Sequence, residues 1–417
     1  MTLQPWFPDA KLGIFVHWGI YAVNGITESW SMFNGEISPE DYLRQLDGFT
    51  AARFDPDAWA ELFHRAGARY AVLTTKHHDG VALWDTDAGD LSVVRRAPAG
   101  RDLVDGYVAA MRRRGLKAGL YFSHADWSHP DYATVRGPIA DENNPMAYAP
   151  VGGEDPARWE RFLAFHRAQI DELLDRFAPD LLWFDGQWER DESQWRFAAL
   201  GEQIRARSPH TVINGRLTGF GDYATPEQGL PITAPDGPWE LCLTVNDSWG
   251  YRPQDHNHKS VRQLVRTFAE VIGAGGNLLL DVGPKPDGTI TPEQADRLLG
   301  LGAWIGRNRD AVYGTRAGLP PGHHYGPSTL SADRRVVYLV CFDAPREFVA
   351  VRGLRNPVRR VSVLGAGAEL AHRVVGGFAE VPGVLYIDAP ADLDEHATVL
   401  AVELDGELDL YRGAGHN

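Results

Sequence analysis

The sequence predicts an α/β fold, an irregular (β/α)8 TIM-like barrel followed by a C-terminal antiparallel β-sandwich. Up to about residue 315, short apolar strands alternate with amphipathic helices, and repeated units of this length are typical of a parallel sheet. After residue 316 the strands are short, β-branched and separated by turn residues, which favours a small sandwich. We therefore expect a barrel domain over residues 1–315 and a sandwich domain over residues 316–417.

The parallel strands of the first domain are predicted from seven apolar segments, at residues 13–18, 70–74, 117–123, 180–185, 211–214, 239–244 and 276–282. Helical patterns lie between them, at residues 56–68, 102–115, 157–177, 193–206, 260–272 and 292–308. Asp55-Pro56 is typical of a helix start, and Gly67 and Gly115 are typical of helix ends. Seven or eight such units favour a barrel, and a doubly wound open sheet is the alternative.

The second domain shows no convincing helical period. Its strands are predicted at residues 336–342, 347–351, 359–364, 383–388 and 398–404. Residues 320–322, Pro-Pro-Gly, indicate a linker region between the two patterns.

The composition narrows the classes of partner. The 417 residues are 44% hydrophobic and 23% charged, as in an ordinary globular protein. A formal net charge of -15 argues against a nucleic-acid surface or an anionic membrane, because phosphate groups bind basic faces. The first residues show no basic stretch followed by an apolar core, and no segment approaches membrane-spanning length. We therefore expect a cytoplasmic protein with a neutral ligand.

The most informative residue is Asp185, which ends a continuous apolar run and is followed at once by Gly186. Such a run predicts a strand buried on both faces of a parallel sheet. The carboxyl end of that strand is where these sheets place their chemistry. The alternative is an aspartate that caps the next helix or begins a turn.

The other strands also end in residues that are costly to place in a core. These residues are His17, Trp18, Lys76, His77, His78, Asp79, Tyr121, Ser123, His124, Trp183, Asn214 and Arg216. Together they predict a polar ring with aromatic walls at the carboxyl face of the barrel. In an extended chain His77 and His78 point to opposite sides, so we expect at most one of them to face the pocket. For Asp79 we expect a structural ion pair.

No metal or cofactor is expected. Neither His-x-His nor His-Glu-x-x-His spacing occurs, and Cys242 and Cys341 are predicted to be small buried hydrophobes. The glycine-rich residues 273–277 follow a helix and precede a strand, which is the reverse of a phosphate-binding loop.

If Asp185 is a nucleophile, a second carboxylate has to give a proton to the leaving group. In retaining glycosidases the two carboxyl groups lie about 5 to 5.5 Å apart. The candidates are Glu227, in a Gly/Pro-rich loop that we expect to swing over the pocket mouth, and Glu240, which begins the next predicted strand. A barrel would place Glu240 on the opposite face, and the alternative for Glu227 is an exposed loop carboxylate.

Five motifs closely resemble the signatures of the α-L-fucosidases of glycoside hydrolase family 29. They are WFPDAKLGIFVHWG at residues 6–19, TTKHHDG at 74–80, LWFDG at 182–186, SWGY at 248–251 and GGNLLLDVGP at 275–284. The resemblance covers about the first three quarters of the chain in the family's order, and the C-terminal stretch matches mainly in class. It implies an irregular barrel with a β-sandwich and a retaining exo-α-L-fucosidase that needs no metal or cofactor.

The resemblance also implies roles for individual residues. Asp185 is the nucleophile, and Glu227 is the acid/base, with Glu240 in reserve. Terminal L-fucose on a glycan is bound by His17, Glu28, Trp30, His77, His78, Tyr121, Trp183 and Arg216. Glu28 and Trp30 look like the family's Glu-Trp pocket motif, although Ser29 intervenes here. The alternatives are a retaining glycosidase for another deoxy or neutral sugar, and an inactive fucose-binding protein on the same scaffold.

Overall fold

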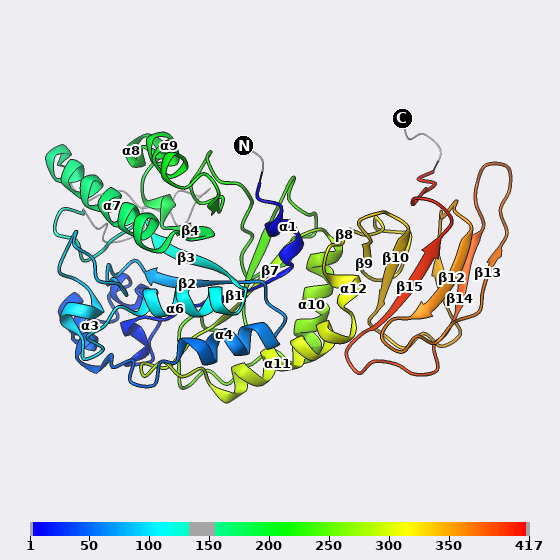
Figure 1. Cartoon of the computed structure of the whole chain (residues 1–417), viewed down its shortest axis with the longest axis horizontal. Helices are drawn as coiled ribbons and strands as arrows, with labels where there is room; N and C mark the ends of the chain where they lie inside the picture. Colours follow the sequence, from blue (N-terminus) through cyan, green and yellow to red (C-terminus); the bar gives the residue numbers. More distant parts are fainter. Residues whose placement is uncertain (1–2, 133–154, 414–417) are drawn as a thin grey trace.

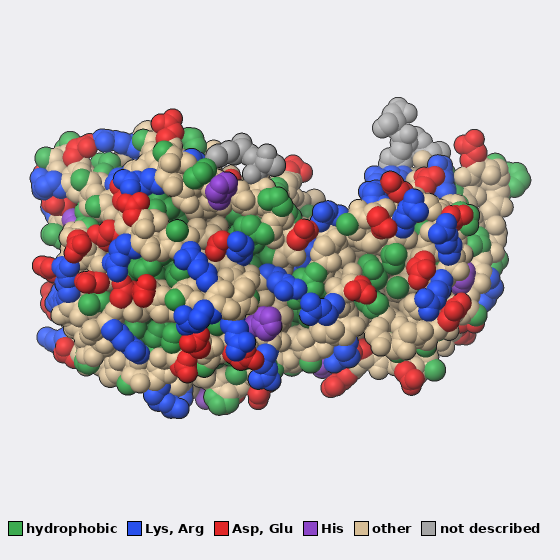
Figure 2. Space-filling model, viewed as in Figure 1, with side chains coloured by type: hydrophobic (Ala, Val, Ile, Leu, Met, Phe, Trp, Pro, Cys, Tyr) green, Lys and Arg blue, Asp and Glu red, His purple; other side chains and the backbone are tan. Residues whose placement is uncertain are grey.

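The molecule is elongated, with a helix-covered parallel sheet at one end and antiparallel sheets at the other (Figure 1). The computed structural model describes residues 3–132 and 155–413. Within these two ranges, no helix is long and apolar enough to cross a membrane. Acidic and basic side chains are interspersed over the face shown in Figure 2, with no large patch of a single sign.

The parallel sheet has seven strands in the order β5-β4-β3-β2-β1-β7-β6, and every neighbouring pair runs parallel. The strands are β1 (Leu12–Val16), β2 (Tyr70–Lys76), β3 (Lys117–Ser123), β4 (Leu181–Asp185), β5 (Val212–Ile213), β6 (Glu240–Thr244) and β7 (Asn277–Val282). All seven predicted strands are therefore confirmed, and sequential βα units place their carboxyl ends at one edge.

An irregular extended segment, residues 222–228, lies between β5 and β6. One parallel bridge joins Tyr223 to Asn214 on the β5 side, and two join Ala224 to Trp239 and Glu227 to Cys242 on the β6 side. Pro226 has no N–H to give to a ladder, so this segment pairs at isolated points rather than as a regular strand. The described residues thus form a curled seven-stranded sheet with this segment across its gap, where we expected a (β/α)8 barrel.

The helices lie mostly on the outside of the curled sheet (Figure 1). They are α1 (Trp6–Ala10), η1 (Ile20–Ala22), α2 (Trp30–Phe33), α3 (Pro39–Leu43), η2 (Arg44–Gly48), α4 (Pro56–Arg65), α5 (Val93–Arg96), α6 (Leu103–Arg113), α7 (Pro156–Phe177), η3 (Gln187–Glu189), α8 (Glu192–Trp195), α9 (Phe197–Arg207), α10 (Val261–Gly273), α11 (Pro292–Arg307) and α12 (Arg309–Val312). Asp55, Asp102 and Ser260 cap α4, α6 and α10 with their side chains, which explains where these helices begin.

One predicted helix, residues 193–206, is wrong in detail. The chain forms α8 and α9 instead, and they meet at Arg196, whose φ of 53° is left-handed. This break lets Trp195 and Phe197 both turn inward, where their rings stack with 5.9 Å between centroids. Burial of two aromatic rings outweighs the cost of one left-handed residue.

The inside of the curled sheet is filled by one cluster from all seven strands, α1 and the extended segment. Its members are Phe7, Ala10, Phe15, Tyr70, Val72, Tyr121, Leu181, Trp183, Val212, Tyr223, Cys242 and Leu279. Gly13 of β1 leaves room for the Tyr70 ring, because a Cβ there would lie 2.3 Å from that ring. This packed interior is the floor of the cavity described below.

The C-terminal strands form two antiparallel sheets, ordered β12-β15-β10-β9-β8 and β11-β14-β13. They are β8 (Arg316–Ala317), β9 (Ser328–Leu330), β10 (Val336–Cys341), β11 (Phe348–Val351), β12 (Val358–Val363), β13 (His372–Val375), β14 (Val384–Asp388) and β15 (Thr398–Leu404). The five predicted strands are confirmed as β10, β11, β12, β14 and β15. The other three are short or, like β13, largely exposed at an edge, so they lack an apolar pattern.

Both antiparallel sheets contribute to one apolar core. Leu339 of β10 and Ile387 of β14 belong to the same buried cluster. The five-stranded sheet also packs against the helical part, where Trp304 of α11 donates a hydrogen bond to the Ala397 carbonyl at 2.8 Å. The expected boundary at residues 315 and 316 stays a prediction.

Candidate active site

A cavity of about 1020 Å³ opens at the carboxyl ends of the parallel strands. The residues assigned first to catalysis or sugar binding line it: His17, Glu28, Trp30, His77, His78, Tyr121, Trp183, Asp185, Arg216 and Glu227. The other members of the predicted polar ring do not line it: Trp18, Lys76, Asp79, Ser123, His124 and Asn214. They come from segments far apart in the sequence, and the parallel topology brings the strand ends together. Parallel sheets place their functional groups at this edge.

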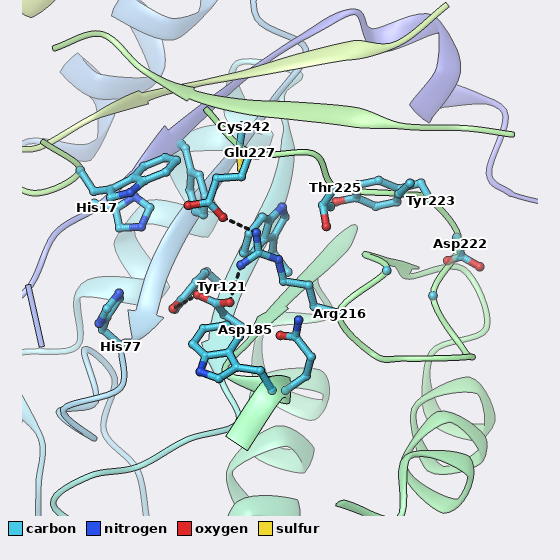
Figure 3. A pocket seen from close by; sticks show the side chains of 18 of the residues that line it. His17, His77, Tyr121, Asp185, Arg216, Asp222, Tyr223, Thr225, Glu227 and Cys242 are labelled. Carbon is cyan, nitrogen blue, oxygen red and sulfur yellow. Dashed lines mark hydrogen bonds and ion pairs between the residues drawn. The ribbon is translucent and has the colours of Figure 1, made fainter. Parts of the chain in front are cut away.

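The centre of the cavity is the guanidinium of Arg216, which lies between the two predicted catalytic carboxylates (Figure 3). Nη1 donates to Asp185 Oδ1 at 2.5 Å, and Nη2 donates to Glu227 Oε2 at 2.5 Å. Because Nη1 and Nη2 belong to one rigid planar group, the two carboxylates are held close to each other. Burial lowers the pKa of Arg216, but the two carboxylates outweigh it and leave the pKa raised.

Asp185 ends β4, and its side chain is 12% exposed. Its Oδ2 accepts a hydrogen bond from Tyr121 Oη at 2.9 Å and lies 3.7 Å from His78 Nε2. Burial by itself would raise the pKa of this carboxyl, but the Arg216 charge, His78 and the two hydrogen bonds lower it below its ordinary value. Asp185 is therefore ionised near neutral pH.

Trp183 forms the platform beneath this group. It stands two residues before Asp185 in β4, so both side chains point to the same face of the sheet. The Arg216 guanidinium carbon lies 4.5 Å from the centroid of its ring, within cation–π range. The indole also stacks on Tyr121, with 5.6 Å between centroids. The aromatic wall thus supports the charged centre.

Three histidines line the cavity, and each has a buried partner. Nδ1 of His17 lies 2.6 Å from Asp281 Oδ1, that of His77 2.6 Å from Ser29 Oγ, and that of His78 2.6 Å from Ser123 Oγ. Burial lowers the pKa of His17 and His78 to about 4, and that of His77 well below its ordinary value. Neutral imidazoles with one nitrogen fixed present the other to a ligand.

The expectation that at most one of His77 and His78 faces the pocket is wrong. Strand β2 ends at Lys76, and its register shifts between Thr74 and Lys76. The two histidines therefore lie beyond the pleated strand, where side chains no longer alternate. Both line the cavity, with 4.2 Å between their ring centroids.

Glu28 and Trp30 reach the cavity although Ser29 stands between them. Glu28 is buried, and its Oε1 accepts a hydrogen bond from the Gly250 N–H at 2.6 Å. Burial raises the pKa of Glu28 against this hydrogen bond. Trp30 begins α2 and stacks on Trp188 at an interplanar angle of 13°. Ser29 turns away to contact His77, so the insertion braces the site rather than blocking it.

Glu227 does not lie on the free loop that the sequence suggests. The main chain of Glu227 forms a β-bridge with Cys242 of β6. The N–H of the following residue, Gln228, donates a hydrogen bond to the Cys242 carbonyl at 2.9 Å. The side chain is 41% exposed and points into the cavity toward Arg216 (Figure 3). Main-chain pairing to β6 therefore positions this carboxylate.

Glu240, the reserve acid/base, does not line the cavity. It is fully buried at the first position of β6, and its Oε1 accepts a hydrogen bond from Trp183 Nε1 at 3.0 Å. Since Trp183 itself faces the cavity, Glu240 lies on the inner side of that ring. This carboxyl cannot deliver a proton to a ligand in the cavity, which leaves Glu227 as the candidate.

The prediction of a structural ion pair for Asp79 is wrong. Among the described residues, Asp79 forms no ion pair, and it accepts a hydrogen bond from Tyr42 Oη at 2.7 Å. Cys242 and Cys341 are free and buried, as predicted, and Cys242 also lines the cavity. Within residues 3–132 and 155–413, no group of three or more histidine, cysteine or acidic side chains is arranged to hold a metal ion.

Comparison with known proteins decides the family. The family model described as Alpha-L-fucosidase matches residues 1–310. Tissue alpha-L-fucosidase of Rattus norvegicus is 32% identical over 75% of this chain and 70% of the rat protein. The chain belongs to the α-L-fucosidase family, glycoside hydrolase family 29.

Solved structures extend this likeness over nearly the whole chain. Alpha-L-fucosidase isoenzyme 1 from Paenibacillus thiaminolyticus is 34% identical, with a TM-score of 0.85 over 96% of this chain and 98% of that one. An alpha-L-fucosidase from Bacteroides thetaiotaomicron is 25% identical, with a TM-score of 0.83 over 96% of this chain and 95% of that one. The α-L-fucosidase fold thus includes the antiparallel sheets that lie beyond the matched residues 1–310.

Several cavity residues of this α-L-fucosidase family member were not predicted. They are Phe15, Gln187, Trp188, Gly215, Gly219, Gly221, Asp222, Tyr223, Ala224, Thr225, Asp236, Pro238, Cys242 and Trp249. Trp249 lies in the SWGY motif and packs 4.9 Å from His17 between ring centroids, so the motif itself was a signal. The loop residues carry no such pattern, because their approach to the cavity depends on how residues 215–238 cross the sheet edge.

Proposed function

We propose that the chain is a retaining exo-α-L-fucosidase that hydrolyses terminal α-L-fucosyl residues from glycans by double displacement. The observation that carries the proposal is the pair of carboxylates, Asp185 and Glu227, held on the two arms of Arg216. Retaining glycosidases need their two carboxyl groups close together, with one placed to attack and the other to exchange protons. The proposal places this pair at the mouth of an irregular (β/α)8 barrel, with a β-sandwich after it.

In the first step an oxygen of Asp185 forms a bond to the anomeric carbon while the glycosidic bond breaks. Glu227 gives its proton to the leaving oxygen. In the second step water attacks the anomeric carbon, Glu227 takes a proton from that water, and the bond to Asp185 breaks to release fucose. The ionised state of Asp185 suits it for attack. No metal or cofactor is required.

The hydrogen bond between Arg216 and Glu227 has to break during this cycle. Glu227 Oε2 lies on Arg216 Nη2, whereas the first step requires the Glu227 carboxyl to face the leaving oxygen. The proposal therefore includes separation of this contact when substrate binds, while Arg216 stays on Asp185. The exposure of the Glu227 side chain, 41%, leaves room for that movement.

The walls of the cavity suit a deoxy sugar. The neutral imidazoles of His17, His77 and His78 exchange hydrogen bonds with hydroxyl groups, and the rings of Trp30 and Trp183 offer apolar faces to a methyl group. A Bacteroides thetaiotaomicron relative carries a trapped covalent intermediate in complex with 2-fluoro-fucosyl fluoride, which supports a covalent step in this chain.

The test is hydrolysis of an aryl α-L-fucoside. We expect turnover by the native chain, loss of turnover in Asp185→Gly, and recovery with azide as a fucosyl azide of inverted configuration, because azide then replaces the nucleophile. Glu227→Ala should be slow on poor leaving groups and much less impaired on activated ones. Glu202→Ala, on an exposed position of α9, is the matched control. Full activity of Asp185→Gly contradicts the proposal.

Two further assays separate the alternatives. A panel of aryl glycosides distinguishes fucose from another deoxy or neutral sugar. Calorimetry with fucose distinguishes an inactive binding protein, which would bind the sugar without turnover. Defined α1,2, α1,3, α1,4 and α1,6 fucosides then identify the linkage.

A further inference from the structure

Outside the cavity lining, the carboxyl group of Glu240 is fully buried. Its Oε2 accepts a hydrogen bond from Tyr70 Oη. Its Oε1 accepts two hydrogen bonds, from Trp183 Nε1 at 3.0 Å and from Tyr223 Oη at 3.3 Å. A buried carboxyl that satisfies three donors from three other segments is costly to remove, because each donor would be left without a partner.

The two donors on Oε1 belong to the segments that carry the catalytic carboxylates. Trp183 stands two residues before Asp185 in β4 and lies under the Arg216 guanidinium. Tyr223 stands four residues before Glu227 in the extended segment between β5 and β6. A single oxygen of Glu240 therefore ties the two segments to each other from beneath the cavity.

The main chain adds a second link. Glu240 N–H donates to the Ala224 carbonyl at 2.9 Å, and Cys242 N–H donates to the Pro226 carbonyl at 3.1 Å. In the other direction, Ala224 N–H donates to the Pro238 carbonyl at 3.0 Å and Gln228 N–H to the Cys242 carbonyl at 2.9 Å, so the main chain ties this segment to β6. The Tyr223 side chain adds a contact to the Glu240 carboxyl. The Tyr223 to Glu240 bond lies at the start of that segment.

We propose that Glu240 is a positioning residue that fixes the Asp185 and Glu227 segments relative to each other through Trp183 and Tyr223. This inference rests on the proposed function, because it assigns those two carboxylates to catalysis. Reacting groups that shift by about 1 Å can lose roughly 10²-fold in rate. Loss of the Oε1 contacts should therefore lower kcat more than it raises KM, because Trp183 and Tyr223 are only part of the lining that holds the sugar.

Two substitutions at Glu240 separate this role from an acid/base role. In Glu240→Gln the amide oxygen can accept the Trp183 and Tyr223 bonds while the NH2 group faces the Tyr70 oxygen. We expect Glu240→Gln to keep kcat within about 5-fold of the native chain, and Glu240→Leu to lose roughly 10- to 100-fold in kcat with KM within about 3-fold. Azide should not restore Glu240→Leu.

A matched pair of tyrosine variants tests whether Glu240 acts through its Oε1 contact with Tyr223. Tyr223→Phe removes a donor to Oε1 on the Glu227 segment, and Tyr70→Phe removes the donor to Oε2 on β2. We expect kcat to fall about 10-fold in Tyr223→Phe and to stay within about 3-fold in Tyr70→Phe. This pair keeps the inference testable if Glu240→Leu does not fold, which circular dichroism would reveal.

Three results overturn the inference: native kcat in folded Glu240→Leu, equal damage in Glu240→Gln and Glu240→Leu, or equal effects of the two tyrosine variants. Each of these outcomes leaves the proposed function standing if the native chain hydrolyses aryl α-L-fucosides. If the native chain hydrolyses none, the proposed function fails first and the inference fails with it.

Discussion

The cavity and the sheet interior beneath it each hold a buried carboxyl group, and the pKa values of the two groups shift in opposite directions. Asp185 in the cavity faces the Arg216 guanidinium, and its pKa lies below the ordinary value. Glu240 in the interior faces neutral donors, and burial raises its pKa to about 7 despite them. Trp183 lies between the two environments, since its ring contacts Arg216 and its N–H contacts Glu240.

This difference shows that burial alone does not decide the charge of a carboxyl group. Burial disfavours the ionised form at both positions, and at Asp185 the Arg216 cation, helped by His78 and two hydrogen bonds, reverses that effect. A nucleophile has to be ionised, whereas a group that positions its neighbours only has to accept their hydrogen bonds. Three predictions test this contrast.

The largest expected effect is that of Arg216→Leu. Without the guanidinium, burial dominates at Asp185, so the pKa of that carboxyl rises and the acid limb of the kcat/KM profile moves to higher pH. Loss of the shared cation should also lower kcat/KM by about 10³-fold. The measurement is a pH–rate profile with an activated aryl α-L-fucoside.

The control for this change is Arg207→Leu, which removes an exposed ion pair with Asp171 and Asp175 on the helical surface. It should leave the profile unchanged. An Arg216→Leu profile whose acid limb stays in place would show that the cation does not set the charge of Asp185.

A smaller effect concerns stability and Glu240. The pKa of Glu240 in the folded chain, about 7, exceeds the ordinary glutamate value of 4.5, so between these pH values the folded chain holds a proton that the unfolded chain has lost. The contribution of Glu240 to the free energy of unfolding is therefore present below pH 4.5 and is lost as pH rises through 7, by about 3 kcal/mol at most. Tyr70, Tyr223 and Arg216 are the ionisable groups around it.

Urea unfolding of the native chain and of Glu240→Gln at pH 5 and pH 7.5 measures the pH-dependent contribution of Glu240 to the free energy of unfolding, because glutamine does not titrate. The stability of the native chain relative to the variant should fall between the two pH values. A constant difference would mean that Glu240 ionises in the interior as readily as in water.

The smallest effect on stability and activity is expected for an arginine–aspartate ion pair that is exposed to solvent. Arg359 and Asp405 pair on the antiparallel sheets, with side chains 59% and 56% exposed. Because water screens this pair, Arg359→Ala should change the free energy of unfolding by less than about 0.5 kcal/mol and leave kcat unchanged. Urea unfolding and an aryl fucoside assay check both values, and a loss above 1 kcal/mol would show that exposure is a poor guide here.

Much of the fold was predictable because its strands are buried on both faces and therefore form continuous apolar runs. The segment of residues 222–228 was not predictable, since Pro226 and isolated bridges give it no strand pattern. The break at Arg196 was missed for a related reason. Helical periodicity continues across it, and only the packing of Trp195 against Phe197 requires the left-handed turn.

In the candidate site, the residue types were predictable and their neighbours were not. Polar residues after apolar runs indicate a strand-end site, and the motifs assigned Asp185 and the histidines. The sequence could not show that both His77 and His78 face the cavity, because this depends on where β2 ends. The sequence also could not decide whether Glu227 or Glu240 is the acid/base. Glu227 lines the cavity, whereas Glu240 lies on the other side of Trp183, away from the cavity.

The sequence by itself determined which groups stand at the carboxyl ends of the strands, because a strand's direction and its apolar run are local properties. Asp185 at the end of β4 is the clearest case. Only the tertiary structure decided the charges and partners of these groups. The Arg216 fork and the Glu240 cluster each join segments far apart in the chain, and a pKa depends on what lies within a few ångströms in space.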